Sequence, residues 1–364
     1  MFIHDRIKKM SNRYYRLKVQ EIVRETSDTI IIHFEQPTAP IAYRPGQFLT
    51  LIIDMKGEKV RRSYSMCSSP HADQTLAVAV KRVSNGKVSN FLNDHLKAGD
   101  TLEVMEPMGS FTPNLNPNFQ RHLVMIGAGS GITPLMSIIK SALSMETRSQ
   151  VSLIYGNRYR QSIIFGKELE ALEAKYNGRF KVIHVLSQPD SEWTGHQGRL
   201  NQTVILKLLE QLSNVEKSDT EFYVCGPEGL MDEVKKALAI MHVPTERIHK
   251  ESFVSTASTT AAPAAEEPVS NVVVTREVTV IYEGSEYKFT VTPKQTILEA
   301  ALDLDIDLPY SCQSGMCTAC RGKCLSGKVK LDEEDGLSEH ELKEGYVLTC
   351  VGHPLTGNVV IEID

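Results

Sequence analysis

Pro309–Gly322 reads PYSCQSGMCTACRG, and this segment governs the organisation of the C-terminal part of the chain. Three of its cysteines follow the spacing C-x4-C-x2-C, and Cys350 comes after 29 further residues. The residues between these thiols are small, so backbone amide groups can approach the sulfur atoms. Seven cysteines in a chain expected in a reducing compartment do not indicate a disulfide framework. The thiols of Cys312, Cys317, Cys320 and Cys350 are therefore predicted to bind metal.

The spacing of these cysteines is that of plant-type [2Fe–2S] centres, in which one loop supplies three thiolates and a distant strand end supplies the fourth. The alternative is a zinc ion with four cysteine ligands, which usually come as two C-x2-C pairs. Only one such pair is present, so the iron–sulfur interpretation is preferred. A cluster of this class carries single electrons at about −400 mV. Cys324 is interpreted as a packed thiol and not as a further ligand.

Length and composition indicate several ordinary globular domains. A chain of 364 residues with 41% hydrophobic and 23% charged residues is too long for one core and too apolar for a disordered chain. No run of 18 apolar residues occurs, and the first ten residues carry charges where a signal peptide needs an apolar stretch. We therefore expect no membrane span and a cytoplasmic location.

Charge is unevenly distributed along the chain. Residues 271–364 contain 16 acidic and 8 basic residues, whereas residues 1–270 contain 29 and 32. Since no run rich in Lys and Arg occurs, nucleic acid is not an expected partner. An acidic C-terminal domain suits association with a basic protein face, although a solvated acidic surface explains the same composition.

Changes in pattern divide the chain into domains. Residues 254–270, VSTASTTAAPAAEEPVS, are small residues and prolines without apolar periodicity and are predicted to form a flexible linker. Short β-like runs broken by turns predict an antiparallel β-barrel over residues 12–118. Apolar strands alternating with helices predict a doubly wound α/β domain over residues 119–253. Residues 271–364 are predicted to form a β-grasp domain around the cysteine loop.

The expected elements follow from these patterns. Barrel strands are expected at 14–23, 29–34, 48–54, 76–83 and 101–107. Strands of the α/β domain are expected at 122–129, 151–157, 181–187 and 221–227, with helices at 133–145, 163–176 and 228–241. The last domain is expected to have strands at 276–284 and 287–292 and a helix at 296–304.

The segment Leu123–Ile139, LVMIGAGSGITPLMSII, reads as a strand, a glycine-rich turn and a helix. Its glycines allow the backbone to approach a phosphate at the helix N-terminus, where unpaired N–H groups favour an anion. Thr133 is expected to cap this helix and Pro134 to occupy its first position. Because Ile132 stands where G-x-G-x-x-G requires glycine, a standard Rossmann site is not supported.

Five segments in order resemble the ferredoxin–NADP reductase family: RSYS (62–65), GKVSNFL (86–92), GAGSGITP (127–134), YVCGP (223–227) and ESF (251–253). With its cysteine-rich C-terminal domain, the chain is similar to the reductase components that supply bacterial oxygenases of the phenylacetyl-CoA epoxidase type. The resemblance covers almost the whole chain outside the predicted linker and the first dozen residues.

The resemblance implies a flavin site in the barrel domain. Arg62 is expected on the FAD pyrophosphate, Tyr64 beside the ring or ribityl chain, and Ser65 near the reactive ring nitrogen. A second pyrophosphate-binding turn is implied for Gly86, Val88 and Ser89. A guanidinium suits a pair of phosphates, which agrees with the role of Arg62. Arg61, next to it, is equally compatible with a plain surface charge.

The resemblance also implies the nucleotide site. The residues that match the pyridine-nucleotide loop are Gly127, Gly129, Thr133 and Pro134, and those that match the nicotinamide-lining segment are Cys225, Gly226 and Pro227. The end of the reductase portion, Glu251 to Phe253, is expected by the flavin. Catalytic roles are implied for Ser65, Cys225 and Glu251, with Cys225 as a shaping contact and not a nucleophile; an inert buried thiol is the alternative.

The choice of nucleotide rests on the end of the second α/β strand. An NAD site usually places a carboxylate there, whereas an arginine accommodates the 2′-phosphate of NADP. The sequence YGNRYRQ supplies Arg158 and Arg160, with no acid before Glu168. NADPH is therefore preferred, and NADH remains the alternative. The role of Trp193 is left undecided.

Together these features predict an electron-transfer flavoenzyme. Electrons are expected to pass from NADPH through FAD and the [2Fe–2S] cluster to a partner oxygenase. One alternative is an NADH-dependent reductase of a ring-hydroxylating dioxygenase, a steroid hydroxylase or a hybrid-cluster protein. Others are a non-catalytic iron–sulfur sensor and a zinc-stabilised interaction protein. FMN in place of FAD is also left open.

Overall fold

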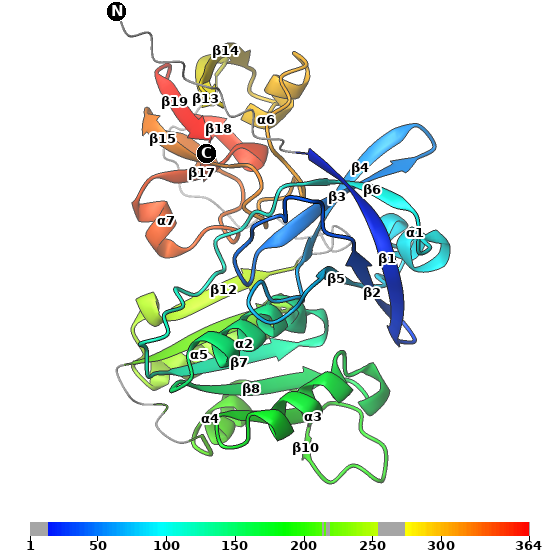
Figure 1. Ribbon diagram of the computed structural model, residues 1–364. Coiled ribbons are helices and arrows are strands. Elements are labelled where there is room, and N and C mark those ends of the chain that lie inside the picture. Colours follow the sequence, from blue (N-terminus) through cyan, green and yellow to red (C-terminus); the bar gives the residue numbers. More distant parts are fainter. Residues whose placement is uncertain (1–13, 213–214, 216–218, 254–273, 364) are drawn as a thin grey trace, which may run out of the picture.

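A computed structural model describes residues 14–212, 215, 219–253 and 274–363 of the chain. The ribbon forms three bodies, each built around one main sheet (Figure 1). The barrel is drawn in blue and cyan, the α/β domain in green to yellow-green, and the C-terminal domain in yellow, orange and red. The predicted linker, 254–270, lies outside the described residues.

The first body is a six-stranded antiparallel sheet in the order β4-β3-β6-β1-β2-β5, curled into a barrel. Alternate side chains along β3, such as Leu49, Leu51 and Ile53, point to one face and join a common apolar core. Its strands are β1 (Tyr14–Thr26), β2 (Thr29–Phe34), β3 (Phe48–Met55), β4 (Glu58–Ser65), β5 (Leu76–Lys81) and β6 (Thr101–Met105). The predicted antiparallel barrel is confirmed.

Two elements of the barrel domain, a strand and a helix, were not predicted, because neither has an apolar run in the sequence. Strand β4 carries basic residues at Lys59, Arg61 and Arg62 where a half-buried strand usually alternates apolar and polar residues. Helix α1 (Lys87–His95) begins after the N-cap Gly86, in a segment predicted as a turn, and buries Val88 and Leu92. Both elements line a cavity between the domains.

The second body is a parallel sheet in the order β10-β9-β8-β7-β11-β12, with helices on both faces. Its strands are β7 (His122–Ala128), β8 (Gln150–Asn157), β9 (Phe180–Leu186), β10 (His196–Gln197), β11 (Thr220–Gly226) and β12 (Ile248–Ser252). Its helices are α2 (Ile132–Met145), α3 (Gly166–Lys175), α4 (Gln202–Leu209) and α5 (Glu228–Ile240). The doubly wound α/β prediction is confirmed, and the strand order reverses between β7 and β11, where ligands bind in such sheets.

The predicted start of α2 is wrong. A 3₁₀ turn, Gly129–Gly131, continues directly into α2, whose N-cap is Gly131 and whose first residue is Ile132. Because helical backbone already precedes α2, no side-chain cap is present, and the Thr133 hydroxyl instead donates to the Ser130 carbonyl (3.0 Å). Pro134 lies at the third helical position, where a missing N–H still costs no intrahelical hydrogen bond.

The third body is a mixed five-stranded sheet in the order β14-β13-β19-β15-β17. Its elements are β13 (Arg276–Tyr282), β14 (Ser285–Val291), α6 (Ile297–Leu302), β15 (Arg321–Ser326), β16 (Val329–Leu331), α7 (Glu339–Lys343), β17 (Tyr346–Leu348), β18 (Gly352–Pro354) and β19 (Val359–Ile363). Helix α6 starts with a capping box between Thr296 and Glu299 and packs on the apolar core of this sheet. This arrangement confirms the predicted β-grasp domain.

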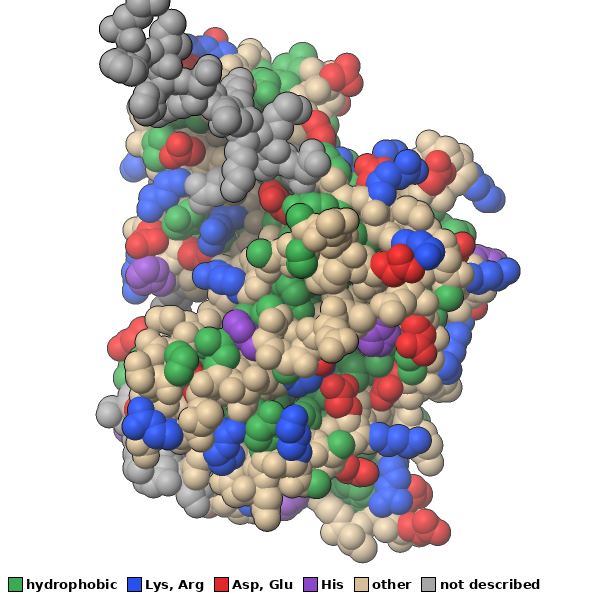
Figure 2. Space-filling view, viewed as in Figure 1, with side chains coloured by type: hydrophobic (Ala, Val, Ile, Leu, Met, Phe, Trp, Pro, Cys, Tyr) green, Lys and Arg blue, Asp and Glu red, His purple; other side chains and the backbone are tan. Residues whose placement is uncertain are grey.

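In the described part of the chain, no helix is both long and apolar enough to cross a membrane. On the face drawn in Figure 2, acidic and basic side chains are interspersed over all three bodies.

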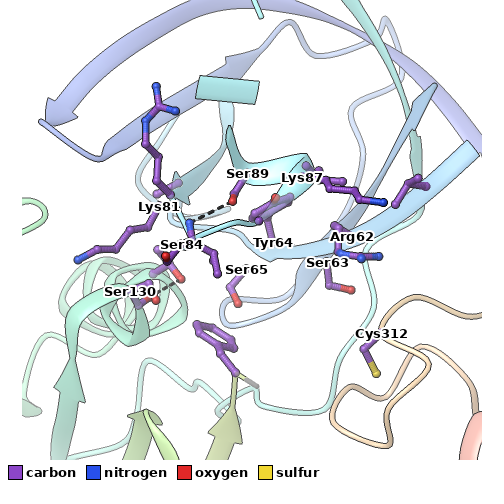
Figure 3. A pocket seen from close by; sticks show the side chains of 18 of the residues that line it. Arg62, Ser63, Tyr64, Ser65, Lys81, Ser84, Lys87, Ser89, Ser130 and Cys312 are labelled. Atoms are coloured by element: carbon purple, nitrogen blue, oxygen red, sulfur yellow. Dashed lines mark hydrogen bonds between the residues drawn. The ribbon is translucent and has the colours of Figure 1, made fainter. Parts of the chain in front are cut away.

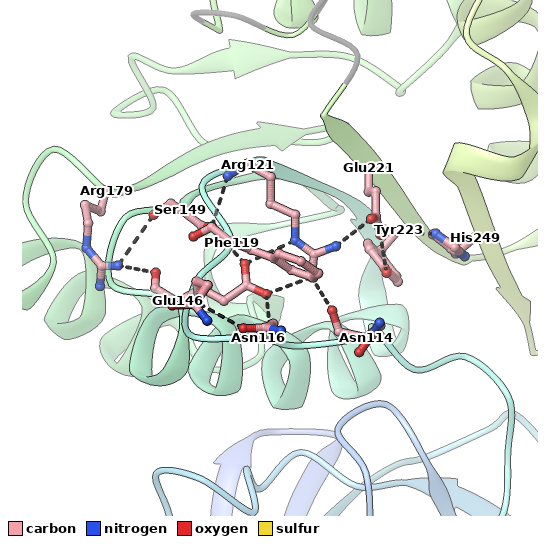
Figure 4. Close-up of polar contacts among 11 residues, drawn as sticks. Asn114, Asn116, Phe119, Arg121, Glu146, Ser149, Arg179, Glu221, Tyr223 and His249 are labelled. Carbon is pink, nitrogen blue, oxygen red and sulfur yellow. Dashed lines mark hydrogen bonds and ion pairs between the residues drawn. The ribbon is translucent and has the colours of Figure 1, made fainter.

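A buried polar network fixes the base of the α/β domain (Figure 4). Arg121, just before β7, donates to both carboxylate oxygens of Glu146 at 2.8 and 3.1 Å and also pairs with Glu221 on β11. The Glu146 side chain is fully buried and that of Arg121 is 8% exposed. Burial alone would raise the pKa of Glu221, but hydrogen bonds from His249 and Tyr223 and the charge of Arg121 lower it to about 2.

Replacing Arg121 with methionine should strongly destabilise the α/β domain, because it leaves the Glu146 carboxylate buried without its counterion. We expect a loss of about 3–5 kcal/mol in the free energy of unfolding, measured from the urea midpoint. Lys236→Met is the matched control, since it removes the solvent-exposed pair Lys236–Glu233 and should have little effect. Equal losses in the two variants would contradict the role given to the network.

Candidate functional site

A cavity of about 730 Å³ lies where the three bodies meet (Figure 3). The barrel contributes β4 and the segment from β5 into α1, the α/β domain contributes Ser130, Thr133 and Phe253, and the C-terminal domain contributes Cys312 and Ser314. This is the size of a site for a cofactor-sized ligand. The cavity therefore joins residues predicted for the flavin, the nucleotide and the cluster.

The barrel side of the cavity suits phosphate. The exposed Arg62 side chain donates one hydrogen bond to the Arg61 carbonyl (2.7 Å) and keeps its charge at the cavity. The N-terminus of α1 opens on the same cavity, and no side-chain cap covers its N–H groups. Ser89 accepts a hydrogen bond from the Val83 N–H (3.1 Å), so its hydroxyl hydrogen is still able to donate. Guanidinium, helix N-terminus and hydroxyl form a donor set that fits a pyrophosphate.

Of the three residues predicted as catalytic, Ser65 lines the cavity, and Glu251 and Cys225 lie behind it, outside the lining. The Ser65 hydroxyl, at the end of β4, donates to the Glu251 carboxyl group (3.3 Å), and Glu251 on β12 is the register partner of Cys225 on β11. Although Glu251 as a whole is only half-buried, burial of its carboxyl group raises its pKa to about 8. Burial, and then the charge of Glu251, raise the pKa of Cys225. At neutral pH the Glu251 carboxyl group and the Cys225 thiol are therefore both uncharged.

The glycine-rich turn after β7 lies against the end of β11. A Cβ atom on Gly131 would stand 2.1 Å from the Cys225 carbonyl oxygen, so only glycine permits this approach. Gly129 has φ of +55°, and its carbonyl accepts a hydrogen bond from Tyr155 (2.8 Å). Gly226 ends β11, and Pro227 is the N-cap of α5. The two predicted nucleotide segments thus meet at the point where the strand order reverses.

The predicted 2′-phosphate residue, Arg158, follows the last residue of β8 and is exposed. Among the described residues it forms no ion pair with a carboxylate. The Arg160 guanidinium lies 5.5 Å from the ring centre of Trp193, whose indole N–H donates to the His196 carbonyl (3.0 Å). Trp193 therefore packs beside the same strand end as Arg158.

The cysteine loop brings the four predicted ligands together. Backbone N–H groups of Ser314 and Cys317 point to the Cys312 sulfur at 3.5 and 3.4 Å. Contacts with the thiols of Cys317 and Cys350 lower the pKa of Cys312, and a contact with Cys350 lowers that of Cys320. Thr349 donates to the Cys320 carbonyl (3.2 Å), which fixes the fourth cysteine next to the loop.

This thiol arrangement suits a binuclear cluster, in which each iron takes two of the four sulfurs. Within residues 14–212, 215, 219–253 and 274–363, no three His, Cys, Asp or Glu side chains are already placed to hold a metal ion. Cys324, in contrast, lies on β15, packs against the domain core and donates to the Ser326 carbonyl (3.3 Å).

Of the predicted cofactor residues, the cavity is lined by Arg62, Tyr64, Ser65, Gly86, Val88, Ser89, Thr133 and Phe253. Gly127, Gly129, Pro134, Arg158, Cys225, Gly226 and Pro227 are not in its lining. Sequence reasoning missed Lys81, Ser84 and Lys87, which line the phosphate side. The signal available for them was the run of basic and small residues from Lys81 to Lys87, which lies where the expected strand 76–83 passes into the turn at Gly86.

Family comparisons agree with the three bodies. The oxidoreductase FAD-binding domain matches residues 16–112, the oxidoreductase NAD-binding domain matches residues 125–236, and the 2Fe-2S iron-sulfur cluster binding domain matches residues 280–355. The chain is therefore an oxidoreductase with domains for FAD, NAD and a [2Fe–2S] cluster.

Several known proteins are similar along nearly their whole length. One component of the 1,2-phenylacetyl-CoA epoxidase of Escherichia coli is 36% identical, over 96% of this chain and 98% of its own. The ferredoxin reductase component of 3-ketosteroid-9-alpha-monooxygenase from Rhodococcus rhodochrous is 39% identical, over 95% and 96%. The solved structure of phthalate dioxygenase reductase shares the fold, with a TM-score of 0.60 and 24% identity over 96% and 98% of the two chains. The chain belongs to the ferredoxin–NADP reductase family, among the reductase components that carry a C-terminal [2Fe–2S] domain.

Proposed function

We propose that the chain takes electrons from NADPH and passes them through FAD and a [2Fe–2S] cluster to an oxygenase of the phenylacetyl-CoA epoxidase type. The observation that carries this proposal is the single cavity that joins the flavin strand β4, Ser130 and Thr133 of the nucleotide domain, and Cys312. The bound cofactors supply the redox chemistry, and the protein supplies binding, orientation and electrostatics.

In this proposal the barrel holds the flavin by its phosphates. Arg62 and the N-terminus of α1 bind the pyrophosphate, with the hydroxyl of Ser89 and the ammonium of Lys87 at the same wall of the cavity. Tyr64 lies on the same face of β4 as Arg62 and packs along the ring or the ribityl chain. Arg62 and the N-terminus of α1 are two separate groups of donors, and FAD has two phosphates to bind to them. FMN has only one phosphate, so this arrangement favours FAD.

Ser65 lines the cavity where the nicotinamide and the flavin ring are proposed to meet, and Glu251 and Cys225 lie behind it. Because its pKa is raised to about 8, Glu251 is protonated at neutral pH and is able to exchange a proton through Ser65. The Cys225 thiol is fully buried and stays neutral, so it shapes the pocket and does not act as a nucleophile. Phe253, 38% exposed, covers the cavity from the end of β12.

We assign the four cluster ligands to Cys312, Cys317, Cys320 and Cys350. The short backbone N–H contacts to the Cys312 sulfur support thiolate character there. Gly315 has φ of +73°, and a Cβ atom on it would stand 2.7 Å from Cβ of Glu333. The loop can therefore fold tightly around the sulfurs only with glycine at this position.

A second candidate acceptor is a steroid monooxygenase. The reductase component of 3-ketosteroid-9-alpha-monooxygenase has slightly higher identity to this chain than the epoxidase component does, 39% against 36%. Both candidates use the same internal route of electrons. They are distinguished by which purified oxygenase turns over its substrate when this chain and NADPH are supplied.

Replacing Cys350 with serine should remove the visible absorbance of the cluster and reduction of one-electron acceptors, while NADPH still bleaches the flavin. Cys324→Ser is the matched control, because Cys324 is the thiol of the same domain that is not assigned as a ligand. Its replacement should leave the cluster intact. Loss of flavin reduction in the Cys350 variant would contradict the modular route, and loss of the cluster in the control would contradict the ligand assignment.

Replacing Arg158 with alanine should raise the KM for NADPH roughly tenfold or more and leave the KM for NADH nearly unchanged. The reason is the loss of a charge-assisted hydrogen bond to the 2′-phosphate, worth about 1.5–3 kcal/mol. Lys181→Ala is the control, since this exposed base lies at the opposite end of the parallel sheet. Equal changes with both nucleotides would remove the basis for choosing NADPH.

Glu251 should make stability fall as pH rises. Its pKa is about 8 in the folded protein against an ordinary value of 4.5, so the folded state keeps a proton that the unfolded state releases. Between these values the free energy of unfolding should decrease by up to about 1.4 kcal/mol per pH unit. Glu251→Gln lacks this loss and should gain stability relative to the unchanged protein as pH rises, measured by urea midpoints.

The exposed Glu246→Gln is the control for this measurement, and its difference from the unchanged protein should not vary with pH. A difference for Glu251→Gln that is equally independent of pH would show that Glu251 is charged in the folded protein.

A further inference from the structure

Strand β4 presents two different faces. Successive side chains of a strand alternate, so Arg62 and Tyr64 point to one face and Arg61 and Ser63 to the other. Arg62 and Tyr64 line the cavity proposed for the flavin, and Ser63 on the second face also reaches it. The second face is where the C-terminal domain lies against the barrel, as the contacts of Arg61 and Ser63 show.

Arg61 is the centre of that contact. Its guanidinium pairs with the Asp307 carboxylate at 3.1 Å and lies 4.1 Å from the ring centre of Tyr310. Tyr14 donates to the other oxygen of Asp307 at 2.7 Å, so both carboxylate oxygens are used across the domain boundary. The Arg61 side chain is 13% exposed, whereas that of Asp307 is 56% exposed. Arg61 is thus a largely buried charge whose counterion comes from another domain.

The same contact places the cysteine loop. Four residues after Asp307, the buried Ser311 accepts a hydrogen bond from Ser63 of β4 at 2.7 Å. The next residue, Cys312, lines the cavity beside Arg62 and Ser63 (Figure 3). The segment from Asp307 to Cys312 is therefore held to β4 at two points, and the second point is adjacent to a proposed cluster ligand.

We propose that Arg61, Asp307 and Tyr14 form a latch that docks the iron–sulfur domain on the flavin domain in the position for internal electron transfer. The proposal rests on the proposed function and assigns positioning residues to it. In the docked position one electron leaves the reduced flavin and the oxidised cluster takes it up. The latch is reversible, because half of the Asp307 side chain faces solvent and salt weakens such a pair.

The latch differs from the other ion pair of β4. Lys59 pairs with Glu103 at 2.9 Å, but both residues belong to the barrel and their side chains are 64% and 33% exposed. Lys59→Gln therefore removes a charge from the same strand without touching the domain boundary. Asp305→Asn is the matching control in the C-terminal domain, two residues before Asp307 and exposed.

The test uses the full chain loaded with FAD and cluster, as Arg61→Gln, Asp307→Asn, the double variant and the two controls. Small-angle scattering at low salt measures the radius of gyration, and rapid mixing with NADPH follows flavin bleaching and then cluster bleaching. We expect both latch variants to have a larger radius and about tenfold slower cluster bleaching, the change that about 1.4 kcal/mol produces, with flavin bleaching unchanged. The double variant should be no worse than either single variant, because the two residues act as one pair.

The latch is overturned if Arg61→Gln and Asp307→Asn match the controls in both radius and cluster bleaching, or if their effects add in the double variant. Asp307→Asn keeps a hydrogen-bond acceptor on an exposed loop, so it reports on the pair even where Arg61→Gln disturbs the barrel. Failure of the proposed function has a different signature: the unchanged protein would not reduce its cluster with NADPH, while scattering would still measure docking.

Discussion

The structure depends on a constraint at strand β4, which serves two domains at once. Arg62, Ser63 and Tyr64 all line the cavity, and Ser63 is also hydrogen-bonded to Ser311 of the cysteine loop. Successive side chains of a strand point to opposite faces, so neighbouring residues of β4 can contact two different domains. Strand β4 therefore contacts the cavity and the iron–sulfur domain at the same time, and Cys312 of that domain lines the same cavity.

The α/β domain contacts the C-terminal end of strand β4. Ser65 closes β4 and contacts Glu251 on β12, and β12 pairs with β11 where the strand order reverses. Strand β4 of the barrel thus contacts both of the other domains. Burial raises the pKa of Glu251 to about 8 at this junction, whereas Arg62, Lys81 and Lys87 give the barrel side of the cavity basic groups. In the proposed function, this division separates the groups that bind the cofactor's phosphates from the place of hydride transfer.

Much of the fold was predictable because its signals are local. The alternation of apolar strands with helices predicted the doubly wound domain, and the cysteine spacing predicted a [2Fe–2S] domain that the family match supports. The start of α2 was wrong, because a 3₁₀ turn precedes the helix and replaces a side-chain cap. Strand β4 lacks an apolar pattern because its side chains serve a cavity and a domain boundary instead of a core.

The contact between Arg61 and Asp307 could not be predicted from the sequence at all. The two residues are 246 positions apart, neither lies in a recognisable motif, and Arg61 was compatible with a plain surface charge. Likewise, the basic residues Lys81 and Lys87 became site residues only when α1 and β4 were seen to enclose one cavity. Long-range pairing depends on how domains pack, and local patterns carry no information on that.

In the proposed function, the flavin and the cluster of one chain lie next to each other at the cavity beside β4. The most direct test of this arrangement is to mix the loaded protein with NADPH without oxygen at several protein concentrations and to follow cluster bleaching after flavin bleaching. The account predicts a rate of cluster bleaching that is independent of protein concentration, because the electron stays within one chain. A rate that rises in proportion to protein concentration would mean that each cluster is reduced by the flavin of another molecule, and would contradict it.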